Sequence, residues 1–481
     1  MRTRLFLGSL LLLLVPGLVT GTSVAVPDSS RTTGVQASGL GPDPYWPKDG
    51  NAGTDALHYS INVSYDFAKK RLSGRTAARM RATRDLRGFS MDLLLKATKV
   101  TVDGVPARFR KSSTHELRIT PATPIAAGEV FRVVVNYAGR PSRLSYAGQR
   151  SWLADRHEVV TMNQPHMAPW WFPSNDHPSD KATYDIKVTA PRAKRVVSNG
   201  TMISRKVKGA KATTHWRMRD PMATYLAFFA AGDFTIEKGR SAAGIRYYNA
   251  VSKRLPAATR KMALRKLRRT ASITDWLQAR LGRYPFTSTG GLVTSLDVGF
   301  ALENQTRPTY GAWIDRDLMV HELAHQWFGD SVSVSRWRDI WLNEGLATYM
   351  ELDHAEAHGG PSVNSWLHRG YVETCGDVDA PFWRLDLTDP GADNIFDAAV
   401  YHRGAMVIAA LRNRIGESDL TRVLRTWVSA HHDSNASVPQ FEALAEEISG
   451  KSLKGFFDAW LRAGKVPAAT PANGITRSCP A

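Results

Sequence analysis

The stretch that decides the fold is DLMVHELAHQWFGDSVSVSRWRDIWLNEGLATYM, residues 317–350. On an α-helix, positions four apart share one face, so His321 and His325 can direct both imidazoles at one metal ion. Glu322 lies beside that pair and can take a proton from an attacking water. A catalytic zinc needs a third protein ligand and an open position. Glu344, near the start of a second helical segment, is the candidate that an antiparallel return would bring to the histidines.

Apolar residues before, within and after the two histidines predict a buried helix, which Gly329 and Asp330 end. A second helix is predicted over residues 340–355. The competing interpretation is a buried helix whose two histidines are satisfied within the protein and bind no metal.

The composition describes a folded protein of two or more domains, because 43% of the 481 residues are hydrophobic and 22% are charged. The net charge is +19, but the basic residues are scattered, and their densest group, within residues 261–269, falls on an amphipathic helical pattern. We interpret that group as a solvated helix face. The pattern contains no nucleic-acid-binding module and allows weak association with anionic surfaces.

The first 25 residues predict a secretory signal peptide, because a basic start is followed by an apolar run to about Val19 and by small residues at 23–25. An uncleaved membrane anchor is the alternative, although Pro16 and Gly17 interrupt the run. No other long apolar run follows, so the protein is expected to be secreted, without an integral membrane segment. Residues 26–50, rich in Ser, Thr, Gly and Pro, predict a linker.

Alternating apolar residues then predict strands at 59–67, 131–137 and 184–188, with turns at 103–104, 127–128 and 138–139. Many short strands of this kind favour a β-sandwich-like domain over residues 51–235.

The following region, residues 236–470, is predicted to be mainly helical, with a tail at 471–481. Apolar stripes predict one helix over 264–281 and another that ends before Gly416, followed by helices at about 420–430, 440–448 and 453–461. Residues 290–311 have the small, alternating character of a strand against which a ligand backbone can pair.

Four motifs together resemble one family. HELAHQW is followed by NEGLATY with its glutamate nineteen positions after His325, while FALEN occupies 300–304 and a tyrosine-x-x-glycine segment begins at Tyr401. This set resembles the zinc aminopeptidases typified by aminopeptidase N, in the gluzincin group. The resemblance implies an α+β multidomain fold, in which an N-terminal β-sandwich-like domain precedes a mainly helical, thermolysin-like catalytic domain. It also implies one Zn²⁺ per chain, held by His321, His325 and Glu344.

The same resemblance assigns the substrate contacts. Ala301 and Glu303 fall in the family's exopeptidase motif, in which the glutamate pairs with the free amine of the peptide, although Phe300 replaces the usual glycine and Leu302 the usual methionine. Gln164 falls where the family holds that amine with an acidic or amide side chain. A surface salt bridge for Glu303 and an ordinary polar loop position for Gln164 are the alternatives.

Tyr401 matches the family tyrosine that donates a hydrogen bond to the oxyanion formed during attack on the carbonyl. A packed helix tyrosine is the alternative, and Tyr371 competes for the role. Cys375 and Cys479 are the only cysteines, and their pairing stays open. The segment FFDAWLRAGKVP is similar to the end of the family's catalytic region, so we expect a short form without the large C-terminal helical domain.

The sequence therefore predicts a secreted, zinc-dependent aminopeptidase, with Glu322 as general base and Tyr401 as oxyanion donor. Its expected partners are peptides with a free N-terminus, and nucleic acid is excluded. Two alternatives remain. A thermolysin-like zinc endopeptidase with an open cleft would cleave N-blocked peptides, and a non-catalytic secreted binding protein would lack bound zinc.

Overall fold

The computed structural model describes residues 41, 43–376 and 380–479. The predicted signal peptide and residues 26–40 of the predicted linker lie outside this part of the chain. Residues 43–50 were also placed in the linker, yet they make specific contacts. Asp43 Oδ2 accepts from the Trp337 backbone N–H at 2.8 Å, and Asp49 Oδ2 lies 2.5 Å from His166 Nδ1.

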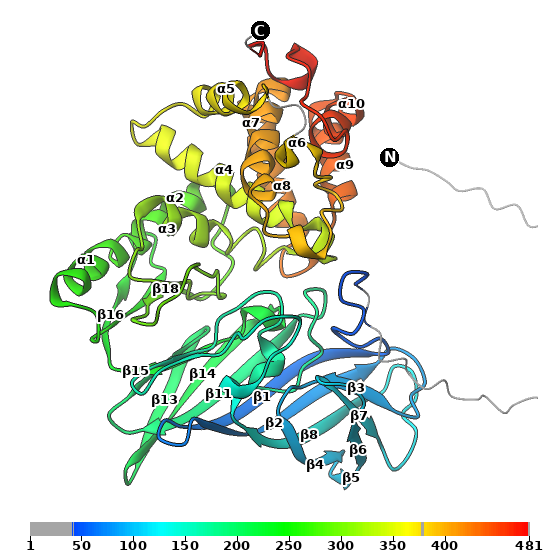
Figure 1. Cartoon of the computed structure of the whole chain (residues 1–481), viewed down its shortest axis with the longest axis vertical. Coiled ribbons are helices and arrows are strands. Elements are labelled where there is room, and N and C mark those ends of the chain that lie inside the picture. Colours follow the sequence, from blue (N-terminus) through cyan, green and yellow to red (C-terminus); the bar gives the residue numbers. More distant parts are fainter. Residues whose placement is uncertain (1–40, 42, 377–379, 480–481) are drawn as a thin grey trace, which may run out of the picture. The chain divides into compact units, whose positions relative to one another are not determined.

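An eight-stranded sheet forms the centre of the β domain (Figure 1), in the order β13-β14-β11-β1-β2-β8-β4-β5. Neighbouring strands are antiparallel, except that β1 and β11 are parallel. The strands are β1 (Thr54–Asp66), β2 (Arg71–Ala82), β4 (Lys96–Val102), β5 (Val105–Pro106), β8 (Val130–Gly139), β11 (Ala182–Pro191), β13 (Thr201–Lys208) and β14 (Lys211–Met222).

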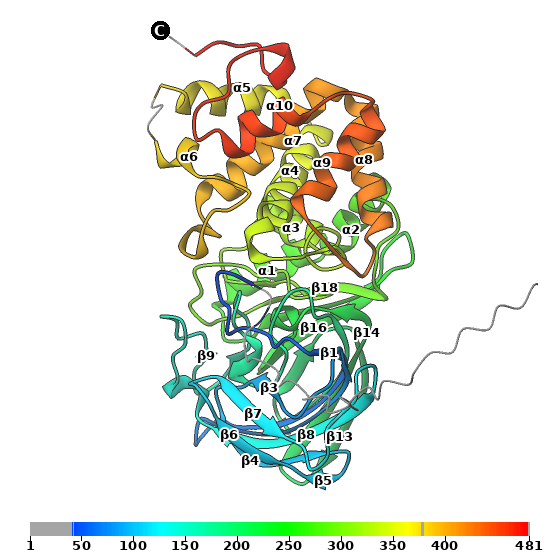
Figure 2. The same ribbon diagram turned by 90° about the vertical axis from the view of Figure 1, so that its right-hand side faces the viewer.

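Two smaller sheets complete the β domain and confirm its sandwich-like character. The three-stranded sheet lies beside the large one (Figure 2), and the Phe89 ring packs 5.1 Å from Phe131 of β8. Its strands are β3 (Phe89–Asp92), β6 (Arg108–Lys111) and β7 (Glu116–Thr120). The four-stranded sheet contains β9 (Leu153–Ala154), β10 (Val159–Val160), β12 (Arg195–Ser198) and β15 (Phe229–Gly232).

One predicted turn is wrong. Ala138 and Gly139 lie within β8, where they pair with Ser73 and Leu72 of β2. The glycine serves close packing here, because a Cβ at position 139 would lie 2.7 Å from the Leu95 side chain.

The region that follows the β domain begins with a four-stranded sheet, although the sequence predicted a mainly helical region from residue 236 onward. It contains β16 (Phe234–Arg240), β17 (Arg246–Ser252), β18 (Ser288–Val293) and β19 (Thr309–Tyr310). A strand was predicted over residues 290–311, but only the two ends of that stretch are strands, in β18 and β19. The FALEN segment lies outside these strands and touches the sheet through an isolated bridge between Leu302 and Thr309.

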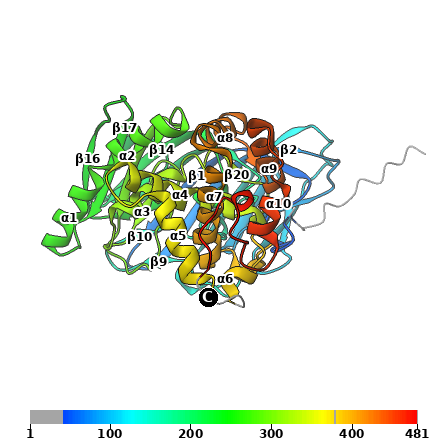
Figure 3. The same ribbon diagram turned by 90° about the horizontal axis from the view of Figure 1, so that it is seen from above.

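Helices form the rest of the region, and α4 packs against both α3 and α7 (Figure 3). They are α1 (Ala257–Leu267), α2 (Thr270–Leu281), α3 (Arg316–Ala324), α4 (Trp341–Ala357), α5 (Val363–Thr374), α6 (Pro381–Arg384), α7 (Gly404–Ile415), α8 (Glu417–Ala430), α9 (Val438–Ser449) and α10 (Lys454–Phe457). π-Helical turns span Ala399–Arg403 and Asp458–Arg462. The remaining elements are β20 (Ser333–Val334), β21 (Asn435–Ala436) and 3₁₀ turns at Pro141–Arg143, Ala168–Trp170, Thr224–Leu226, Trp337–Asp339, Ala392–Asn394 and Pro471–Asn473.

The single helix predicted over 264–281 is two helices, α1 and α2. The Leu267 carbonyl accepts a hydrogen bond from Asn249 Nδ2 at 2.9 Å, and the helical ladder is interrupted just after it. The predicted stop at Gly282 is confirmed, since α2 ends at Leu281 and Gly282 follows with a φ of +101°.

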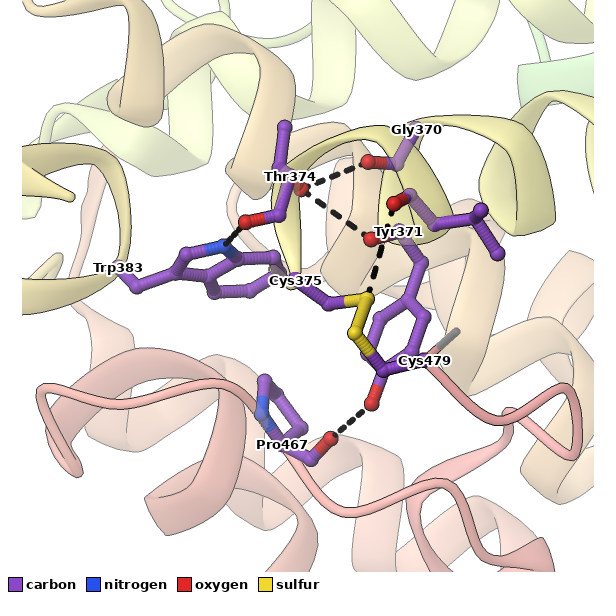
Figure 4. The surroundings of a disulfide bond; sticks show 8 residues. Gly370, Tyr371, Thr374, Cys375, Trp383, Pro467 and Cys479 are labelled. Atoms are coloured by element: carbon purple, nitrogen blue, oxygen red, sulfur yellow. Dashed lines mark hydrogen bonds between the residues drawn. A yellow bond between two sulfur atoms is a disulfide. The ribbon is translucent and has the colours of Figure 1, made fainter. Parts of the chain in front are cut away.

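A disulfide joins Cys375, which caps α5, to Cys479 in the last described segment (Figure 4). Beside it, the Tyr371 hydroxyl donates to the Pro467 carbonyl at 2.7 Å. This hydrogen bond engages the Tyr371 hydroxyl with the C-terminal tail. Tyr401 is therefore the better candidate for the hydrogen-bond donor to the oxyanion. None of the helices in the described part of the chain has the length and apolarity needed to cross a bilayer.

Candidate metal centre and substrate cavity

Two helices deliver the predicted metal ligands. Asp315 caps α3 by accepting from the Leu318 N–H at 2.9 Å. His321 lies in the last turn of α3. His325 is the first residue after α3 ends, and its backbone N–H donates to the His321 carbonyl at 3.1 Å. Glu344 lies in the first turn of α4.

The three ligand atoms form a compact triangle. Nε2 of His325 lies 3.0 Å from Nε2 of His321, and Glu344 Oε2 lies 3.4 Å from the first histidine and 3.3 Å from the second. Around an ion with bonds of about 2.0–2.1 Å, tetrahedral ligands lie roughly 3.3 Å apart. The triangle therefore has the dimensions of a tetrahedral zinc site with a fourth position open.

Hydrogen bonds at the far side of each imidazole fix which nitrogen faces the ion. His325 Nδ1 lies 2.9 Å from the Phe328 carbonyl, and His321 Nδ1 lies 2.6 Å from Glu351 Oε1. A carbonyl and a carboxylate accept, so each Nδ1 carries the proton and each neutral ring presents the Nε2 lone pair. Two lone pairs that face each other at 3.0 Å repel, and a cation between them removes that repulsion. The residues present thus fit zinc.

A pair of glycines brings the tyrosine to the metal ligands. A Cβ on Gly345 would lie 2.8 Å from backbone atoms of Gly404, so α4 and the start of α7 touch backbone to backbone. Tyr401 lies in the π-helical turn just before α7, and its ring stacks on His321 with centroids 6.0 Å apart. The tyrosine-x-x-glycine spacing therefore places a phenol beside the helix that supplies Glu344.

A cavity of about 440 Å³ contains every predicted site residue. Its lining includes the three ligands, Glu322 and Tyr401, together with Gln164 from the β domain and Ala301 and Glu303 from the FALEN segment. Further residues line it that sequence reasoning did not assign to the site: Phe300, Trp313, Asp315, Asp317, Leu318, Thr348, Glu351, Ala398 and His402. Glu351 was detectable, because it lies seven residues, about two helical turns, after Glu344.

Three buried carboxyl groups, those of Glu303, Glu322 and Glu344, line this cavity. Burial, with help from Glu303 and Glu344, raises the pKa of Glu322 to about 8. Burial also raises the pKa of Glu303. Burial and the three carboxylates raise the pKa of Tyr401 well above its usual value, so the phenol keeps its proton and can donate. A metal cation and a substrate ammonium group in this cavity would offset the burial and mutual repulsion of these carboxyl groups and favour their ionised forms.

Several polar atoms in the cavity have no hydrogen-bond partner within the described chain. They are Oε2 of Glu322, Oε1 of Glu303 and Nε2 of Gln164. Buried polar groups are normally paired, so orphaned atoms that line a cavity are expected to meet a ligand. His166 and His177, two further histidines of the β domain, do not line the cavity. His166 pairs with Asp49, and His177 Nδ1 lies 2.6 Å from Ser179 Oγ.

Fold and site together have the arrangement of a metallopeptidase zinc centre. Residues 55–226 match the family model of the peptidase M1 N-terminal domain, and residues 290–460 match that of the peptidase family M1 domain. The chain belongs to peptidase family M1.

Relatives and solved structures agree with this assignment. Aminopeptidase N of Lactococcus lactis subsp. cremoris is 25% identical over 452 residues, which are 86% of this chain and 51% of the relative. The M1 zinc metallopeptidase of Deinococcus radiodurans superposes with a TM-score of 0.80 at 26% identity, covering 89% of this chain and 99% of that one. A mutant of that enzyme bound to a Tyr-Ser-Ala substrate gives 0.79 at 25% identity, with the same coverage. The chain spans about half the length of the curated relatives it matches.

Proposed function

We propose that the protein is a zinc-dependent aminopeptidase that hydrolyses the first peptide bond of peptides with a free N-terminus. The observation that carries the proposal is the position of Glu303. This carboxylate is 3% exposed, has one oxygen without a partner, and shares a cavity with the metal ligands and Glu322. A buried carboxylate there can pair with the substrate ammonium, which holds the first peptide bond near the metal.

The residues of the chain divide the remaining work. Bound zinc polarises the scissile carbonyl and lowers the pKa of a water to about 7. Glu322 accepts the proton of the attacking water at its unpartnered Oε2 and delivers it to the leaving amine. Tyr401 donates to the oxyanion, and Gln164 accepts a hydrogen bond from the substrate amine beside Glu303.

A neighbouring cavity provides room for the first side chain. It has a volume of about 320 Å³ and shares Gln164, Phe300, Ala301 and Tyr401 with the metal cavity. Leu302 and Phe396 add apolar lining, and Gln149 and Asn163 add polar groups. We therefore expect apolar and aromatic first residues to be preferred over charged ones.

The test is Glu322→Gln. The amide keeps the shape of the side chain but cannot accept the proton, so turnover of aminoacyl amides should fall by roughly 100- to 10,000-fold. Zinc content should stay at that of the wild type. Glu373→Gln, which changes an exposed carboxylate on α5, is the matched control. Undiminished turnover in Glu322→Gln would remove this residue from the mechanism.

We further propose that the protein is exported. Two features support this: the signal-peptide pattern of residues 1–25, and the disulfide between Cys375 and Cys479, a bond that persists mainly in oxidising compartments. Protein recovered outside the producing cells should begin near residue 26 by N-terminal sequencing and should show no free thiol under denaturing, non-reducing conditions. A chain that stays inside the cells and starts at Met1 would contradict export.

A further inference from the structure

A second group of buried ligand-type side chains lies in the β domain, away from the elements that carry the zinc triad. Asp92 ends β3, His115 directly precedes β7, and Glu116 begins it. Asp49 approaches from the segment before β1. All four are buried, at 0–4% exposure. Like the zinc triad, Asp92, His115 and Glu116 each direct one ligand atom into a sphere that a single ion can occupy.

Three carboxylate oxygens lie around one nitrogen, Nε2 of His115. His115 Nε2 lies 3.3 Å from Asp49 Oδ1, 3.7 Å from Asp92 Oδ1 and 4.0 Å from Glu116 Oε1. The Lys48 carbonyl oxygen lies 2.9 Å and the Tyr146 hydroxyl 3.1 Å from the same nitrogen. Because a carbonyl only accepts, Nε2 carries a proton while no metal is bound, and an ion that binds this nitrogen must displace that proton. Ligands of an ion with bonds of about 2.0–2.2 Å lie roughly 3–4 Å apart, so the carboxylate separations suit a bound metal.

Strand pairing forces two of the carboxylates together. Asp92 and Glu116 are direct partners in the antiparallel β3–β7 ladder, where like charges oppose pairing. Burial, followed by Glu116, raises the pKa of Asp92 well above its usual value. Burial is also the largest influence on Glu116 and raises its pKa to about 7, although Ser90, Arg118 and Lys111 act in the opposite direction.

The Glu116 side chain itself points to a ligand. Its side chain alone is 6% exposed, and both of its buried oxygens lack a well-formed hydrogen bond from the described residues, although Ser90 lies near enough to favour the ionised form. Asp49 is already satisfied, because Tyr146 donates to its Oδ1 at 2.5 Å and His166 contacts its Oδ2. Lys111 directs its ammonium to the Thr114 carbonyl at 3.1 Å. An unsatisfied, buried carboxylate that faces an imidazole and a second carboxylate is a usual setting for a cation.

We propose that Asp92, His115 and Glu116 bind a divalent transition-metal ion of the zinc class, with Asp49 completing the site. Imidazole nitrogen combined with carboxylate oxygen is a donor set that such ions accept, whereas Ca²⁺ and Mg²⁺ prefer oxygen alone. The ion neutralises the opposed Asp92–Glu116 pair. It also ties residues 48–49 to the end of the three-stranded sheet, so its role is structural.

Zinc stoichiometry of the full chain tests the proposal. After chelator treatment and dialysis against buffered, low free zinc, the wild type should hold two equivalents by plasma mass spectrometry. Glu116→Gln should hold one, because an amide is a poor zinc ligand. A double variant, His321→Ala with His325→Ala, removes the catalytic site and should also hold one. Glu129→Gln, an exposed carboxylate of the same domain, is the matched control and should keep two.

Two further readouts on the double variant guard against loss of folding. Added zinc should raise its thermal midpoint, and adding Glu116→Gln should abolish that rise. The zinc X-ray absorption spectrum should show one imidazole among oxygen ligands. A folded double variant that binds no zinc would overturn the proposal and leave protons as the neutralising charges. Retention of the second zinc equivalent in Glu116→Gln would overturn the proposal as well. So would a spectrum in which this second zinc has two imidazole ligands.

Discussion

Replacing Glu303 by glutamine removes one negative charge from the substrate cavity while it preserves the shape of the side chain and one acceptor oxygen. The carboxylate is 3% exposed, so its pairing with an ammonium is poorly screened. Truncating one partner of a buried charge pair costs about 2–5 kcal/mol. Because glutamine still accepts a hydrogen bond, we expect the lower end of that range, about 2–3 kcal/mol, or a loss of roughly 30- to 150-fold in kcat/KM.

The assay compares kcat and KM for an aminoacyl amide, and most of the loss should appear in KM. Two hydroxamate inhibitors that differ only in the α-amine measure the contribution of that amine to binding. Glu303→Gln should weaken the inhibitor that carries an α-amine and leave its des-amino copy within a factor of about two, since only the amine meets this carboxylate. Glu373→Gln should change neither inhibitor. If both inhibitors weakened equally, or if KM stayed constant, the anchoring role of Glu303 would be refuted.

Four further changes probe other parts of the account. Tyr401→Phe should lower kcat by roughly 100- to 1000-fold with little change in KM, because the oxyanion loses its donor, and an unchanged single-turnover rate would contradict this. Gly404→Ala places a Cβ against the facing glycine of α4 and should cost about 1–3 kcal/mol in unfolding free energy as well as turnover, whereas Gly455→Ala, which meets open space, should cost little. Glu351→Gln should weaken zinc binding by about 10- to 100-fold in a competition titration, and an unchanged zinc affinity would exclude it as the orienting partner. His354 has its pKa lowered to about 4 by burial and a neighbouring histidine, so the folded state resists protonation between pH 6.5 and 4 and loses stability there as the pH falls. The unfolding free energy of His354→Gln, compared with that of the wild type, should therefore rise by about 1–2 kcal/mol when the pH is lowered from 7.5 to 4.5, after allowance for solvent screening. Urea unfolding at the two pH values measures this difference, and a difference that does not change with pH would refute the assignment.

Short-range spacing explains why the zinc triad was predictable. His321 and His325 are one helical turn apart, so their direction follows from helix geometry alone. Glu344 needed only one further assumption, that the next helix returns to the histidines, and the first turn of α4 does lie against them. The β-sandwich-like domain was predictable for a similar reason, because alternation along β1, β8 and β11 is a local pattern.

Tertiary context accounts for what the sequence did not reveal. Residues 43–50 have the composition of a linker, but Asp43 and Asp49 are held by partners far along the chain. At the break between α1 and α2, the last carbonyl of α1 accepts a hydrogen bond from Asn249, which lies on β17. Asp92 lies more than twenty residues before His115 and Glu116, and only the β3–β7 pairing brings them together. No local periodicity carries such information.

The most direct test of the central claim is the turnover of a panel of aminoacyl fluorogenic amides beside their N-acetylated copies, with and without a zinc chelator. The account predicts chelator-sensitive cleavage of the free-amine compounds alone, fastest for apolar and aromatic first residues. Cleavage of the acetylated copies at similar rates would contradict it and favour an endopeptidase. Absence of all cleavage in protein with its zinc bound would contradict the assignment of an aminopeptidase.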